Sequence, residues 1–206
     1  MNVLDGSQAD VLAGTRRRIL EVARGLFSER TYLGVSMSDI AGRLGITKTA
    51  LYYHFASKTE IYGTVLDDVF ARLRGRIAEA SAEATPEGQL RRLLMNYLEF
   101  GRQEKNLINA LVVGLSPGGA QVRERVVRFR EELVALVQPI IEGALACRNL
   151  PAAVDSFFVS HLLMGMMDGL IVERSFLGQS VDPENVADHI LALLGLRAEP
   201  SAAASR

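Results

Sequence analysis

The hydrophobic and polar positions of this chain repeat with a helical period in almost every segment between Thr15 and Leu196. Apolar residues recur three and four positions apart, and Gly and Pro separate one segment from the next. We find no convincing strand alternation and no internal repeat in the sequence. The pattern predicts an all-α protein of about nine helices, with a flexible arm at 1–14 and a flexible tail at 198–206.

Capping signals set the expected bounds of the helices. Ser36 with Asp39 forms an acidic capping box, and Gly45 is suited to a left-handed helix end. Thr85-Pro86 and Asp182-Pro183 each place an N-cap before a proline. We expect helices over about 15–28, 36–44, 47–55, 57–82, 85–103, up to 115, 121–147 with a bend near Pro139, from after Pro151 to 177, and 182–196.

The segment from Ser36 to Phe55 has the spacing of a helix-turn-helix. Ala41 precedes Gly45 by four residues and Leu51 follows it by six. Two crossing helices need a small residue at the crossing, a Gly at the turn and an apolar residue that locks the angle. An ordinary helical hairpin is the alternative on spacing alone.

The outward face of the second of these helices favours DNA binding. Hydrogen-bonding and aromatic side chains gather there, namely Thr47, Lys48, Thr49, Tyr52, Tyr53 and His54. DNA offers phosphates and base edges to such groups, and Lys58 lies in the first turn of the next helix, where a phosphate is favoured. For Tyr53, packing against a neighbouring helix is an equal alternative.

Charge is distributed unevenly along the chain. Residues 15–58 hold eight basic and three acidic side chains, a net charge of +5. Because the whole chain has a net charge of −1, the remainder carries −6. This asymmetry indicates an anion-binding module joined to a neutral or acidic domain, although a solvated helix face also collects charges.

Together these motifs resemble the TetR family of bacterial transcriptional regulators. The resemblance lies in residues 36–41, 44–55 and 57–61, and the run from Arg18 to Phe27 fits the family's first helix. It implies a DNA-binding domain over 15–60, with the helix-turn-helix at about 36–55. It also implies base contacts from Thr47, Lys48 and Thr49, phosphate contacts from Tyr52, His54 and Lys58, and backbone contacts from Ser36 and Ser38.

The resemblance further implies an effector-binding and dimerisation domain over 61–197. Candidate lining residues of a pocket for a small apolar or amphipathic effector are Asn96, Tyr97, Phe100, Asn109, Phe157, His161, Met164 and Asp168. Gly165 and Gly169, four residues apart, let two helix backbones approach, and Ile190 and Leu194 lie on the last apolar stripe. These four residues predict a homodimer interface, with core packing inside one chain as the alternative. A dimer would read a pseudo-palindromic operator as a repressor that its effector releases.

Other functional classes fit less well. An effector-independent architectural DNA-binding protein of the same fold is the main alternative. An enzyme is not expected, since the histidines are scattered at 54, 161 and 189 and no paired carboxylates or phosphate-binding glycine loop occur. No metal or other cofactor is expected. The single Cys147 in an apolar run, the lack of a signal peptide and the lack of an uncharged apolar run of about 18 residues predict a cytoplasmic protein without a membrane span.

Overall fold

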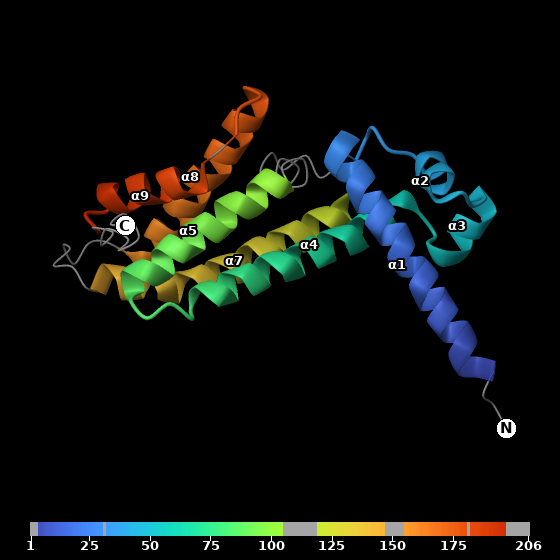
Figure 1. Ribbon diagram of the computed structural model, residues 1–206, viewed down its shortest axis with the longest axis horizontal. Helices are drawn as coiled ribbons and strands as arrows, with labels where there is room; N and C mark the ends of the chain where they lie inside the picture. The colour runs from blue at the N-terminus through green and yellow to red at the C-terminus, as the bar shows by residue number, and fades with distance from the viewer. Residues whose placement is uncertain (1–3, 31, 105–118, 147–154, 181, 197–206) are drawn as a thin grey trace, which may run out of the picture. The chain divides into compact units, whose positions relative to one another are not determined.

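The computed structural model describes residues 4–30, 32–104, 119–146, 155–180 and 182–196, and these contain eight α-helices and no strand (Figure 1). The all-α prediction is confirmed. The expected sixth helix, Cys147 and Asn109 lie outside the described residues. The helices are α1 (Leu4–Arg30), α2 (Met37–Leu44), α3 (Lys48–His54), α4 (Lys58–Ala80), α5 (Pro86–Gln103), α7 (Ala120–Ala146), α8 (Ser156–Phe176) and α9 (Pro183–Leu193).

The first helix begins earlier than the sequence pattern predicts. Helix α1 starts at Leu4, so residues 4–14, expected as an arm, are helical, and the start expected at Thr15 is wrong. The Thr15 hydroxyl donates a hydrogen bond to the Val11 carbonyl oxygen, one turn back in the same helix, at 3.0 Å. The side chain therefore bonds within a continuing helix, and no proline precedes it to stop the helix from extending.

The chain forms two compact units. The first contains residues 1–69 and 109–126, and its described part holds α1, α2, α3 and the beginnings of α4 and α7. Its core includes an aromatic cluster in which the ring centroids of Phe27 and Tyr32 lie 5.0 and 4.8 Å from that of Tyr62. Burial raises the pKa of Tyr62 to about 12, because the phenolate form is poorly solvated there.

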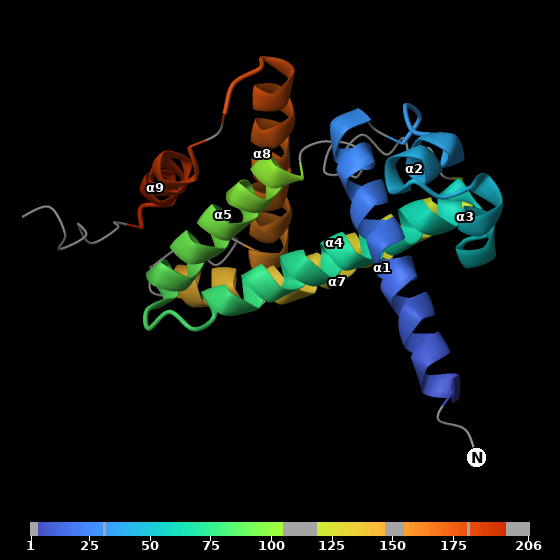
Figure 2. The ribbon, with the colours of Figure 1, turned by 45° about the vertical axis from the view of Figure 1, so that its right-hand side comes forward.

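The second unit contains residues 70–108 and 127–206. Its helix α5 packs against both α8 and α9 (Figure 2). The approach to α8 is close, since a Cβ built on Gly101 would overlap Cδ1 of Ile171. On its other side, Arg91 of α5 forms a 2.8 Å ion pair with Asp188 of α9. Glycine at position 101 therefore sets the separation of α5 and α8.

Helix α8 is, among the described helices, the one long and apolar enough to cross a membrane by length and composition. A third of its most apolar window is buried inside the chain, however, and its Asp168 is engaged by other side chains of the same unit. Core helices of soluble proteins pass the same test, so length and composition alone are weak grounds for a membrane span.

Candidate nucleic-acid interface

The two short helices α2 and α3 form the predicted helix-turn-helix. The Ser36 hydroxyl accepts a hydrogen bond from the Asp39 amide at 3.2 Å, and Asp39 Oδ2 accepts one from the Ser36 amide at 2.8 Å. The capping box is therefore confirmed. The hydrogen bonds from Ser36 lower the pKa of Asp39, because they stabilise its carboxylate form.

The turn between the helices also has the predicted geometry. Gly45 adopts φ 69°, and the amides of Gly45 and Ile46 donate to carbonyls in the last turn of α2. Ala41 and Leu51 are both buried, at the crossing of the helices and on the inner side of α3 respectively. Glycine adopts a left-handed backbone conformation more easily than other residues do. The turn therefore explains why position 45 is a glycine.

The outer face of α3 is open. The Thr47 hydroxyl caps α3 by accepting from the Ala50 amide at 3.1 Å, while Lys48 and Thr49 are exposed. Tyr52 and Tyr53 keep exposed fractions of 51% and 76%. The exposure of Tyr53 decides against the alternative that it packs on a neighbouring helix. Two open tyrosines beside a lysine and a threonine form a surface suited to a partner with phosphates and base edges.

A surface hollow of about 430 Å³ adjoins this face. It is lined by residues 33–39, which include the first turn of α2, and by Lys48, Tyr52 and Lys58. Both Ser36 and Ser38 are exposed there. The start of a helix, a lysine and a phenol hydroxyl are features that favour binding of an anion, so the hollow is suited to a backbone phosphate.

Two of the predicted contact residues have additional partners. Lys58 Nζ donates to the carbonyl oxygens of Tyr32 and Val35 at 2.9 and 2.8 Å and lies 4.0 Å from the Tyr32 ring centroid. His54 is half-buried, and its carbonyl oxygen accepts from Arg16. Since two of the three ammonium hydrogens of Lys58 are already used, at most one is left for a phosphate.

The predicted effector residues do not form one cluster. Tyr97 and Asp168 come together, because the tyrosine hydroxyl donates to Asp168 Oδ1 at 2.5 Å. Phe100 and Met164 are buried in the same unit. By contrast, Phe157 and His161 are exposed on α8, 4.2 Å apart between ring centroids. The remaining described candidate, Asn96, donates to the Arg76 carbonyl at 2.7 Å.

Sequence reasoning missed Arg130, which completes the polar group around Asp168. Its Nη1 donates to Asp168 Oδ2 at 2.6 Å, so both carboxylate oxygens are bound. Burial, and then the charge of Asp168, raises the pKa of Tyr97 well above its ordinary value. A signal was present, since Arg130 interrupts an apolar stripe between Val126 and Leu133.

The four predicted interface residues also differ in how far they are exposed. Gly165 and Gly169 are exposed, and a Cβ built on either would meet nothing within 4 Å. Ile190 is buried inside the chain and Leu194 is half-buried. The apolar stripe left open on α8 consists of Phe158, Leu162, Met166 and the two glycines.

The sequence of this interface and the fold that carries it are similar to those of known proteins. Residues 19–65 match the family model described as bacterial regulatory proteins, tetR family. The chain is 27% identical over 180 residues to the HTH-type transcriptional regulator TtgR of Pseudomonas putida, covering 82% of this chain and 83% of that one. It is 31% identical over 131 residues to the HTH-type transcriptional repressor DhaR of a Mycobacterium species, covering 62% and 66%. A crystal structure of AibR in complex with isovaleryl coenzyme A and operator DNA has the same fold, with a TM-score of 0.70, 21% identity and coverage of 89% and 99%.

Proposed function

The chain belongs to the TetR family of bacterial regulatory proteins, and on that premise we propose that it is an operator-binding repressor that a small molecule releases. The observation that carries the proposal is the open face of α3, where Lys48, Thr49, Tyr52 and Tyr53 stand exposed on a helix-turn-helix. We assign base contacts to Thr47, Lys48 and Thr49, and phosphate contacts to Ser36, Ser38, Tyr52, Tyr53, His54 and Lys58. Residues 15–60 are the DNA-binding domain in this proposal, and 61–197 the effector-binding and dimerisation domain.

The partner in operator binding is a second copy of the chain. The open stripe on α8 supports this, because Phe158, Leu162 and Met166 remain exposed beside two glycines that let another backbone approach. A dimer would present two copies of α3 to a pseudo-palindromic site. Sedimentation velocity tests the assembly: Leu162→Glu puts a charge into the stripe and should give monomers, whereas a variant that stays dimeric would reject α8 as the interface.

The effector is an apolar or amphipathic small molecule. The proposed effector-binding domain supplies mainly aliphatic and aromatic side chains with a few buried polar groups, as selective small-molecule sites do. Since AibR was crystallised with an acyl coenzyme A, acyl thioesters are the first compounds to screen. We place the protein in the cytoplasm and assign it no catalytic activity.

Two measurements test the function. Selection from a pool of random duplexes should yield a pseudo-palindromic sequence, and failure to enrich any sequence would reject operator binding. Fluorescence anisotropy on the selected duplex, with and without acyl thioesters, should then show release. A regulator that selects an operator but is neither released nor thermally stabilised by any compound would be the effector-independent alternative.

A further inference from the structure

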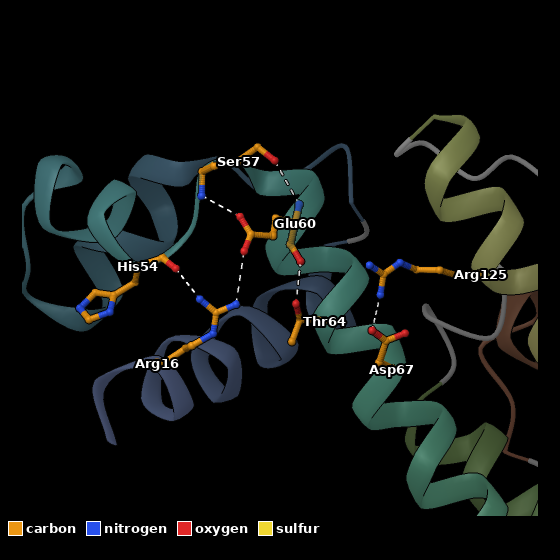
Figure 3. A network of polar contacts seen from close by, with 8 residues as sticks. Arg16, His54, Ser57, Glu60, Thr64, Asp67 and Arg125 are labelled. Atoms are coloured by element: carbon orange, nitrogen blue, oxygen red, sulfur yellow. Dashed lines mark hydrogen bonds and ion pairs between the residues drawn. The ribbon is translucent and has the colours of Figure 1, made fainter. Parts of the chain in front are cut away.

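Arg16 of α1 reaches the far end of α3 (Figure 3). Its Nη1 donates to the His54 carbonyl oxygen at 2.6 Å, and its Nη2 pairs with Glu60 Oε1 at 3.3 Å. The guanidinium carbon lies 3.9 Å from the centroid of the Phe55 ring. Three contacts therefore hold one side chain at the point where α3 ends and α4 is about to begin.

The position of these contacts determines what they can do. Helix α3 has only seven residues, Lys48–His54, and the carbonyl oxygens of its last turn lack partners inside the helix. A cation at a helix C-terminus satisfies such an oxygen and complements the helix dipole. Glu60 extends the link, because its second oxygen accepts from the Ala56 amide at 2.8 Å. The end of α3 is thus bonded to α1 and, through the Arg16 side chain, linked to α4.

The same contacts reduce the charge that Arg16 can offer to DNA. Its guanidinium is paired with a carboxylate and covers an aromatic ring, whereas the next two residues, Arg17 and Arg18, are exposed. We propose that Arg16 is a positioning residue that sets the orientation of α3, and thereby operator specificity, rather than a phosphate ligand. The proposal rests on the operator-binding function proposed above.

Base contacts and phosphate contacts respond differently to a small displacement of α3. Hydrogen bonds to base edges need a fixed geometry, while non-specific binding depends on the number of phosphates neutralised. Loosening the end of α3 should therefore weaken binding to the selected sequence and leave binding to other DNA unchanged. It should also leave the salt dependence unchanged, since no phosphate contact is lost.

The test compares Arg16→Met with Arg17→Met by fluorescence anisotropy between about 50 and 200 mM KCl, a range over which affinity from phosphate contacts falls steeply. The probes are a 30-base-pair duplex, roughly three helical turns, carrying the sequence selected by the unaltered protein, and a scrambled duplex of the same composition. For Arg16→Met we expect an affinity for the selected duplex that is lower on the order of tenfold. Binding to the scrambled duplex and the slope of log K against log[KCl] should not change. Arg17→Met is the matched control for loss of one exposed charge on the same helix.

Two results would overturn the proposal. If the slope of log K against log[KCl] becomes less steep by about 0.9 and binding to both duplexes weakens, Arg16 is a phosphate ligand. Unchanged affinity with a lower melting temperature would make it a structural residue only. If Arg16→Met does not fold, Arg16→Lys keeps the charge but not the forked geometry, and it should still lose affinity for the selected duplex alone. If the unaltered protein selects no sequence, the proposed function itself fails.

Discussion

Replacing Arg130 by methionine should destabilise the second unit strongly. The Asp168 side chain is 2% exposed, and its two oxygens are bound by Tyr97 at 2.5 Å and by Arg130 at 2.6 Å. Methionine keeps much of the aliphatic volume but leaves the buried carboxylate with one donor. Breaking a buried pair in this way costs about 3–5 kcal/mol. Since the Arg130 side chain is 33% exposed, water can reach the vacated edge, and we expect about 3 kcal/mol.

The assay is urea denaturation followed by circular dichroism at about 222 nm, the usual wavelength for a helical protein unfolding cooperatively. The transition midpoint should fall without a large change in the slope of free energy against urea concentration. Arg128→Met is the matched control, because Arg128 is exposed on the same helix and its loss should change stability by no more than about 0.5 kcal/mol.

A second substitution separates the effect of the unpaired charge from that of the lost arginine side chain. Replacing Asp168 by leucine in the Arg130→Met background removes the uncompensated charge, so the double variant should recover most of the lost stability. A loss below about 1 kcal/mol in Arg130→Met, which is no more than an ordinary neutral hydrogen bond, would refute the argument that the carboxylate depends on this arginine. A double variant less stable than Arg130→Met would refute it as well.

Three further predictions follow from local geometry. Gly101→Ala should cost about 1–3 kcal/mol in urea denaturation, because the new methyl overlaps a side chain of α8, whereas Gly25→Ala, which meets nothing within 4 Å, should stabilise by about 0.5–1 kcal/mol. Equal effects would contradict the close packing of α5 on α8. Lys58→Met should lower the stability of the first unit by about 1–3 kcal/mol, since two loop carbonyls lose their donor, and an unchanged urea midpoint would argue against those bonds. The raised pKa of Tyr62 adds stability below pH 10.0 that is lost as pH rises towards about 12. Tyr62→Phe should therefore remove part of the alkaline loss of stability, and an identical pH profile would show that Tyr62 does not contribute to it.

Much of the helix-turn-helix could be predicted because its determinants are local. The capping box of Ser36, the left-handed Gly45 and the cap at Thr47 each act within about four residues. The residue types alone therefore predict the local geometry. The sequence pattern misplaces the start of α1 for a related reason. Thr15 looks like a cap in sequence, but the helix continues through Gly14 before it, and no proline in residues 4–14 breaks the helix.

The second unit is harder to predict because its interactions join distant residues. Tyr97 and Asp168 are 71 positions apart, and Arg130 lies 38 positions from Asp168. No periodicity shows that these three helices bring their polar groups together. The exposure of Phe157 and His161 is equally hidden, since an apolar helix has the same pattern whether it faces a pocket, its own core or a second copy.

Caps, periodicity and turn residues act over short distances, so they predict the helical class, the bounds of most helices, and the exposed face of α3 with the turn before it. Which cations are already engaged becomes clear from the folded chain alone. Arg16 and Lys58 look like free positive charges in the sequence, yet both donate to backbone carbonyls between 23 and 38 positions away. The partner of a long side chain depends on the fold around it. The fold therefore decides whether the charge is used in contacts within the protein or remains available to DNA.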